Sequence, residues 1–307
     1  MVIIMSEAAR RRLDMLKTAL GSISEYLDSE TITEVMLNPN GTIWVNEMGK
    51  GMYKTDITLN NDAADRIIRL IATAAGMEIT QSDPSLAAKL PHWGARVQAS
   101  IPPYSVDGPT FNFRMPARKI YTLDEYVESE IMTQAQANIL KQAIKNKENI
   151  LVSGGTGSGK TTLTNALLNE IAGSNDRVIM IEDNLELQCP VENLVRKLVN
   201  PPELTLSKAI FDSLREYPTR IIVGEVRDRS AYDLISIWNT GHPGNICTLH
   251  ADSAEDSLER LNRLAQQEQP HFDFKNEIGK AVGACVHLKE DALCLPGRRV
   301  TKVIEVN

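Results

Sequence analysis

Residues 151–162 constrain this chain more than any other stretch. They read Leu-Val-Ser-Gly-Gly-Thr-Gly-Ser-Gly-Lys-Thr-Thr and fit the pattern G-x-x-x-x-G-K-[ST], which runs from Gly154 to Thr161. The mainly apolar residues 149–152 predict a strand before the loop, and residues 160–171 predict a helix after it. Glycines at such a junction let successive backbone N–H groups turn inward around a phosphate. The sequence therefore predicts a site for a nucleoside triphosphate.

Each part of this loop has an expected role. We expect Lys160 to bind the β- and γ-phosphates of ATP, and the Thr161 hydroxyl to bind Mg²⁺. The amino end of the following helix adds partial positive charge beside the phosphates. The residues expected to contact the nucleotide are Gly154, Gly155, Thr156, Gly157, Ser158, Gly159, Lys160, Thr161 and Thr162.

Composition narrows the class of protein. A chain of 307 residues is long enough for about two domains. Its net charge of −7 argues against a surface broadly adapted to nucleic acid, and leaves a local basic channel as the alternative.

The four cysteines form no C-x-x-C pair, so neither a zinc site nor a disulfide framework is expected. No apolar run reaches the ~20 residues of a membrane span, and charged residues follow the apolar residues 1–5 at once, so we expect a cytoplasmic protein.

The order of the predicted strands and helices indicates an α/β protein with two domains. Residues 1–116 predict a small α+β domain, residues 117–121 a linker, and residues 122–307 a mostly parallel sheet flanked by helices, because strands and helices alternate there. In the first domain we expect a helix over residues 62–75 that Asp62 caps. The strands expected in that domain cover residues 33–37, 42–45, 53–59, 96–101 and 110–114.

The helix predicted over residues 6–20 has two interpretations. Leu13, Leu16 and Leu20 form an apolar stripe at helical spacing, with the arginines 10–12 on the polar side. A basic amphipathic helix of this kind can lie on a membrane surface. The stripe is short, which favours packing on its own domain or on a neighbouring subunit.

Two predicted strands after the loop end in carboxylates. Residues 220–225 read Arg-Ile-Ile-Val-Gly-Glu, so Glu225 ends an apolar strand where ATPases of this kind carry a metal-side acid; the usual Asp position holds Gly224. Residues 177–187 contain a second such strand, which ends in Glu182 and Asp183. One acid would orient Mg²⁺ through water, and the other would take a proton from the attacking water. The sequence leaves open which acid has which role.

A polar cluster lies further along, in residues 240–250. His242 precedes a predicted strand, and Thr248 and His250 stand at its end. Side chains at the carboxyl edge of a parallel sheet face the ligand crevice. Metal binding by His242 and His250 would need further ligands, so we favour a γ-phosphate sensor or a structural histidine for each.

These segments resemble a known family. The segments 154–161, 177–187, 220–225 and 240–250 stand in the order and spacing of the Walker A, Asp, Walker B and His boxes of the secretion traffic ATPases. The chain closely resembles the TrbB-type branch, which serves type IV secretion and conjugative DNA transfer. This resemblance implies a RecA-like P-loop NTPase domain behind an N-terminal domain that covers the nucleotide.

The resemblance also implies further site residues and partners. The first domain of the family supplies arginines to the phosphates, and Arg96 and Arg114 stand at the matching positions. Members form hexameric rings at the inner face of the inner membrane, with a secretion channel and a coupling protein. The main hypothesis is thus a Mg²⁺-dependent ATPase that powers conjugative DNA transfer or type IV secretion. Its expected catalytic residues are Lys160, Glu182, Glu225, His250, Arg96 and Arg114.

Two alternatives share these motifs. A type IV pilus or type II secretion-like assembly motor would carry the same boxes, but type II secretion ATPases have a tetracysteine zinc module that is absent here. Residues 214–220 follow the conjugation branch, although Thr219 replaces its usual Asp. A DNA-translocating RecA-like motor is the second alternative. The acidic net charge and the 5% aromatic content argue against direct strand binding.

Overall fold

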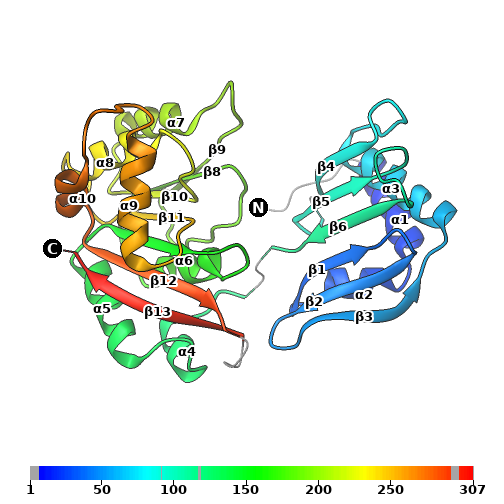
Figure 1. The fold of residues 1–307 in the computed structure, drawn as a ribbon, viewed down its shortest axis with the longest axis horizontal. Helices are drawn as coiled ribbons and strands as arrows, with labels where there is room; N and C mark the ends of the chain where they lie inside the picture. Colours follow the sequence, from blue (N-terminus) through cyan, green and yellow to red (C-terminus); the bar gives the residue numbers. More distant parts are fainter. Residues whose placement is uncertain (1–6, 91, 117–118, 292–296, 307) are drawn as a thin grey trace. The chain divides into compact units, whose positions relative to one another are not determined.

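The computed structural model describes residues 7–306 except 91, 117–118 and 292–296. Ser6, Cys294 and part of the expected linker lie outside the described residues. The chain divides into two compact units, Met1–Lys119 and Ile120–Asn307 (Figure 1). Each unit contains its own β-sheet and its own apolar core. No helix among the described residues is long and apolar enough to cross a bilayer.

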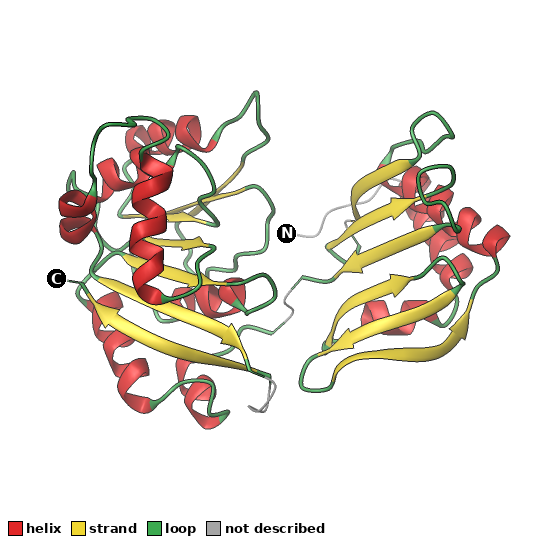
Figure 2. Ribbon diagram, in the orientation of Figure 1, coloured by secondary structure: helices red, strands yellow, loops and turns green. Residues whose placement is uncertain are grey.

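The first unit is a six-stranded antiparallel sheet in the order β3-β2-β1-β6-β5-β4, with its helices on one face (Figure 2). Alternate side chains of the strands face these helices, so one face of the sheet is apolar and the other is polar. The elements of this unit are α1 Glu7–Leu20, α2 Ile23–Asp28, β1 Ile32–Leu37, β2 Thr42–Glu47, β3 Gly51–Thr58, α3 Asn61–Ala75, β4 Ser85–Leu90, β5 Ala95–Ser100 and β6 Thr110–Arg114.

Two helices of this unit refine the expectations from the sequence. Helix α1 packs its apolar stripe into the core of its own unit, where Leu16 and Leu20 are buried. The expected cap of α3 was wrong: the side chain of Asn60 accepts a hydrogen bond from the backbone N–H of Ala63 at 2.8 Å. Asp62 lies inside the first turn instead, where its charge favours the positive end of the helix dipole.

The second unit is a seven-stranded sheet in the order β13-β12-β7-β11-β10-β8-β9. All neighbouring strands pair in parallel except β12 and β13, which form an antiparallel hairpin at one edge. The elements are α4 Leu123–Glu128, α5 Gln134–Lys145, β7 Ile150–Gly154, α6 Lys160–Asn169, β8 Val178–Glu182, β9 Leu194–Leu198, α7 Leu206–Ser213, the 3₁₀ turn η1 Leu214–Glu216, β10 Arg220–Val223, α8 Ala231–Trp238, β11 Ile246–Leu249, α9 Ala254–Ala265, α10 Lys275–Ala281, β12 Ala284–Glu290 and β13 Arg298–Glu305.

An apolar core lies on each face of this sheet. Helices α4, α5 and α6 cover one face, and α7 to α10 cover the other. The central strands β7, β8, β10 and β11 are therefore buried along their whole length, which explains why they read as continuous apolar runs. The expected mostly parallel sheet is present, and the antiparallel hairpin of β12 and β13 closes it at one edge. Helix α4, which we did not predict, begins with a capping box between Thr122 and Glu125.

A buried ion pair joins two strands at the amino edge of this sheet. Arg220, which is 5% exposed, donates from Nε to Oδ2 of Asp176 at 2.7 Å, and Lys147 donates to Oδ1 at 2.7 Å. Burial raises the pKa of Asp176, but hydrogen bonds from Lys147 and Arg220 outweigh it and lower the pKa to about 2. The carboxylate is thus ionised and fully paired at neutral pH.

We predict that Asp176→Asn lowers the free energy of unfolding at neutral pH by about 3 kcal/mol, because it leaves the Arg220 charge buried without its partner. The pKa of Asp176 is lowered by folding, so the ion pair stabilises fully above the usual value of 3.8 and is lost as the pH falls through about 2. Urea unfolding of both proteins between about pH 7 and pH 3 measures this, and the difference between them should shrink toward the acid end.

Asp212→Asn is the matched control, because Asp212 pairs with Lys208 on an exposed helix surface. Its unfolding midpoint should stay close to that of the wild type, since exposed pairs contribute little. A stability difference for Asp176→Asn that is absent at neutral pH would contradict the assignment.

Candidate active site

The parallel strands bring the expected site residues to one edge of the second sheet. Strands β7, β11, β10 and β8 are successive neighbours, and they run in the same direction. Gly154 ends β7, His250 follows β11, Glu225 follows β10 and Glu182 ends β8. Residues far apart in the sequence therefore meet at the carboxyl ends of adjacent strands, beside the phosphate loop.

The loop requires glycine at its first position. Gly154 has a φ of 154°, and a Cβ there would lie 2.3 Å from the carbonyl oxygen of Leu288, which pairs with Gly154 across β7 and β12. A side chain at this position would force the two strands apart.

Lys160 begins helix α6 and is largely buried. Its Nζ donates hydrogen bonds to the carbonyl oxygens of Gly154 and Gly155, both at 2.9 Å, and lies 3.4 Å from Nδ1 of His250. Thr161 and Thr162 follow in the first turn of the same helix. The ammonium group is thus held inside the curve of the loop, where the pattern predicts the phosphates.

Glu225 stands at the centre of a chain of polar contacts. His250 approaches it from one side, with Nε2 at 3.1 Å from Oε1. On the other side Arg227 donates to Oε2 at 2.6 Å, and its second guanidinium nitrogen donates to Asp183 at 3.0 Å. The contacts run from Lys160 through His250, Glu225 and Arg227 to Asp183. They connect all four sequence boxes.

The surrounding cations keep Glu225 ionised. Burial raises its pKa, but the hydrogen bond from Arg227 and the charges of Arg227, His250 and Lys160 outweigh burial, so the pKa lies below the usual value. Its Oε1 atom is buried and accepts no hydrogen bond of good geometry from any residue that the structure describes. Glu225 therefore presents an ionised carboxylate whose Oε1 lacks a well-aligned hydrogen-bond donor among the described residues.

The residues at this edge fit a magnesium ion bound mainly by phosphate and water. Within the described ranges, no group of three or more His, Cys, Asp or Glu side chains forms a metal site of its own. Mg²⁺ in phosphate-transfer sites takes only one or two protein ligands and keeps several waters. The Thr161 hydroxyl and the ionised carboxylate of Glu225, whose Oε1 lacks a hydrogen-bond partner among the described residues, match that requirement.

Glu182 is held differently from Glu225. Its Oε1 accepts hydrogen bonds from the backbone N–H groups of Glu186 and Leu187, both at 2.7 Å, and Arg196 donates to Oε2 at 3.3 Å. The side chain is only 2% exposed, and burial raises its pKa. A Cβ on Gly224 would lie 3.2 Å from Cγ of Glu182. The Glu182 side chain therefore packs over Gly224, where other ATPases carry an aspartate.

The two expected arginines of the first unit lie opposite each other. Arg96 on β5 pairs in register with Arg114 on β6, on the sheet face away from the helices. Cross-strand partners have adjacent side chains, and like charges there destabilise a sheet. Arg114 also lies 3.7 Å from Glu34 on β1. The polar face of this sheet thus carries two adjacent arginines with one glutamate beside them.

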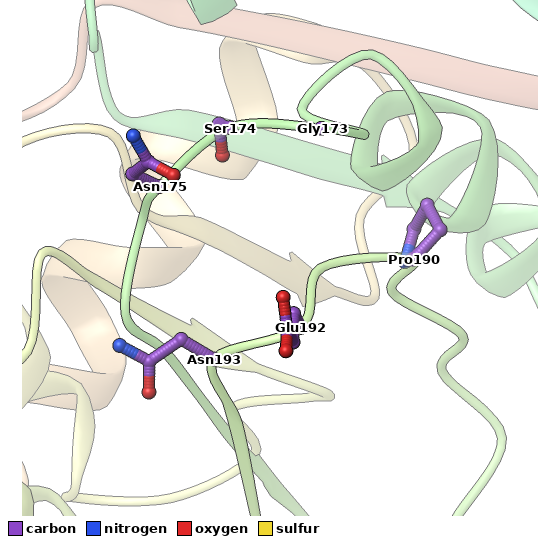
Figure 3. A pocket seen from close by; sticks show the side chains of 6 residues that line it. All are labelled: Gly173, Ser174, Asn175, Pro190, Glu192 and Asn193. Atoms are coloured by element: carbon purple, nitrogen blue, oxygen red, sulfur yellow. The ribbon is translucent and has the colours of Figure 1, made fainter.

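A cavity of about 630 Å³ lies away from the phosphate loop (Figure 3). Its residues precede β8 and β9, so it opens at the amino edge of the sheet, opposite to the carboxyl ends that carry the expected site. The residues that line it are Gly173, Ser174, Asn175, Pro190, Glu192 and Asn193. We assign no role to this cavity in nucleotide binding.

Comparison with known proteins identifies the family. The family described as "Type II/IV secretion system protein" matches residues 17–299. The chain belongs to this family. It is 38% identical over 299 residues to the conjugal transfer protein TrbB of Rhizobium radiobacter, which covers 96% of this chain and 90% of TrbB. It is 31% identical over 291 residues to the type IV secretion system protein PtlH of Bordetella pertussis, which covers 86% and 85%. The predicted relation to TrbB-type proteins is confirmed.

Solved structures of secretion ATPases support the fold class. The VirB11 ATPase of the Brucella suis type IV secretion system, solved with sulphate, is 28% identical, and the match covers 98% of this chain and 97% of VirB11 with a TM-score of 0.50. The Legionella pneumophila ATPase DotB matches 97% of this chain and 80% of its own with a TM-score of 0.67. Its 20% identity supports the fold alone. The expected α/β fold class is confirmed.

Sequence reasoning missed the partners of the two acids in this family member. Arg227 stands two residues after one box and Asp183 lies within another, but nothing in their spacing indicated that one guanidinium bridges carboxylates that follow different strands. Arg196 on β9 was missed as the partner of Glu182. Such contacts depend on which strands are neighbours in the sheet, and the order of the strands along the chain does not give this.

We predict that Glu182 anchors the turn after β8. Glu182→Ala should lower the free energy of unfolding by about 2 kcal/mol, because it leaves the backbone N–H groups of Glu186 and Leu187 without their acceptor. Glu182→Gln should lose much less, since the amide oxygen can accept the same bonds. Urea unfolding measures both variants. Equal stability of Glu182→Ala and wild type would show that the turn does not depend on this side chain.

Proposed function

We propose that this chain is a Mg²⁺-dependent ATPase that powers conjugative DNA transfer or type IV secretion. The contacts from Lys160 through His250 to Glu225, at the sheet edge beside the phosphate loop, carry the proposal. They combine a cation for the phosphates with an ionised carboxylate for water. The similarity to TrbB, a conjugal transfer protein, supports the biological process.

In the proposed reaction, the oxygen of a water molecule forms a bond to the γ-phosphorus as the bond to the β–γ bridging oxygen breaks. ADP and phosphate are the products. Glu225 accepts the proton of the water, because it is ionised at neutral pH and its Oε1 has no well-aligned hydrogen-bond donor among the described residues. His250 lies beside this oxygen, with Nε2 at 3.1 Å from Oε1. Glu182 supports the fold of the site, since its oxygens are already bonded.

Positive charge stabilises the phosphates in this mechanism. Lys160 exchanges the carbonyl oxygens of Gly154 and Gly155 for oxygens of the β- and γ-phosphates. Mg²⁺, held by Thr161 and through water by Glu225, would neutralise charge on the same phosphates. We propose that Arg96 and Arg114 add charge as the γ-phosphoryl group leaves, since both lie on one polar sheet face.

We further propose that the chain acts as a homohexamer at the inner face of the inner membrane, with a secretion channel and a coupling protein. The match to the Type II/IV secretion system family supports this assembly. The net charge of −7 argues against direct binding of nucleic acid by the surface as a whole.

Two variants test the proposed function. Lys160→Ala should lose nucleotide binding, and Glu225→Gln should still bind ATP while its kcat falls by about 100-fold or more, because the base is absent. ATP turnover with Mg²⁺ is measured on purified protein, together with its mass by sedimentation. Glu259→Gln is the control, because Glu259 pairs with Lys275 on the surface. Wild-type turnover by Glu225→Gln, or no ATP binding by the wild type, would overturn the proposal.

We also predict that Arg227 sets the acid side of the pH–rate curve. Its guanidinium lowers the pKa of Glu225, so Arg227→Gln should raise that pKa and move the acid limb of kcat to higher pH. Arg229→Gln removes a charge two residues away that pairs with Glu268 instead, and should leave the limb in place. Identical acid limbs for Arg227→Gln and the wild type would mean that Glu225 is not the group that titrates.

A further inference from the structure

The closing hairpin of the sheet borders the phosphate loop. Strand β12 pairs in parallel with β7, and the last pair of that ladder joins Leu288 to Gly154. Leu288 and Val300 belong to the same core as α6, the helix that follows the loop. The hairpin end that contains Glu290 and Arg298 therefore lies next to the loop, on the sheet face that carries α6.

Glu290 and Arg298 extend this contact onto the loop itself. They are register partners in the antiparallel pair of β12 and β13, so their side chains point to the same face. A Cβ on Gly157 would lie 2.7 Å from Oε1 of Glu290, and a Cβ on Gly159 would lie 2.7 Å from Nη1 of Arg298. One acid and one base from the hairpin thus contact two glycines of the loop.

Of these two residues, Arg298 bears more directly on the binding of an anion in the loop. Its Cδ, Nη1 and Cζ atoms all lie within 3.6 Å of the position that a Cβ on Gly159 would take, so the side chain runs along the residue before Lys160. The structure gives Arg298 no hydrogen bond or ion pair with any described residue, while its charge acts on the buried Tyr126. A guanidinium beside the amino end of a helix adds to the local attraction for an anion.

We propose that Arg298 is a further nucleotide-binding residue, whose guanidinium donates a hydrogen bond to a phosphate oxygen of the bound nucleotide. This inference rests on the proposed function, because it needs a nucleotide in the loop. It adds a cation from the same unit to Lys160, on the side of the loop that faces the hairpin. It also gives a reason for glycine at position 159, since any Cβ there would displace the guanidinium.

A fluorescent ADP analogue, titrated into the full chain, tests this. Arg298→Gln should weaken its binding by about tenfold or more, because a hydrogen bond to a charged group is lost. Arg298→Lys keeps the charge but lacks the forked donors of a guanidinium, so its affinity should lie between those of Arg298→Gln and the wild type. Arg299→Gln is the matched control: it removes the same charge one residue away, where Arg299 pairs with Asp291. It should bind the analogue within about twofold of the wild type.

Two results would overturn the inference: wild-type affinity in Arg298→Gln, or an equal loss in Arg299→Gln, which would mean that only net charge matters. If Arg298→Gln unfolds at a lower temperature than the wild type without nucleotide, its weaker binding is not informative, and the affinity of Arg298→Lys becomes the test. Wild-type affinity of Arg298→Lys would then contradict the proposal. Failure of the wild type to bind the analogue would instead reject the proposed function itself. The two failures are therefore distinguishable.

Discussion

Parallel pairing around β7 is the constraint on which the proposed site depends. Ser153 pairs with Leu249 of β11, and Gly154 pairs with Leu288 of β12. Because these strands run in the same direction, the loop, His250 and the end of the hairpin meet at one edge. An antiparallel neighbour would send its last residue to the opposite edge. The same pairing buries both faces of the central strands, so helices must cover both.

At this edge, burial and neighbouring hydrogen bonds and charges shift the pKa of each carboxyl group in opposite directions. Burial alone would raise the pKa of Glu225 and favour its protonated form. Arg227, His250 and Lys160 outweigh burial, so the pKa is lowered. At Glu182 burial prevails, although two backbone N–H groups and Arg196 hold its carboxyl group. Two acids at the ends of neighbouring strands thus differ in availability. This difference is the physical basis for assigning water activation to Glu225.

Much of the fold could be predicted because its signals are local. The loop, the buried strands β7, β8 and β10 and the closing hairpin follow from glycine positions, apolar runs and turn residues that lie close together in the chain. The wrong prediction of the α3 cap was also a local matter. Asn60 and Asp62 both suit the start of a helix, and in the structure Asn60 has the extended backbone of the cap position and accepts the capping hydrogen bond. Helix α4 is only six residues long, too short for a periodic pattern, although its capping box was visible.

The sequence by itself determined the phosphate loop, the acids at the strand ends and the family, since each is written in consecutive residues. Only the tertiary structure decided that β11 and β10 lie between β7 and β8, and so which side chains meet. It also distinguished Glu182 from Glu225, because the turn after β8 folds its own N–H groups back onto Glu182. Contacts of this kind depend on how distant segments pack, which short-range patterns in a chain do not encode.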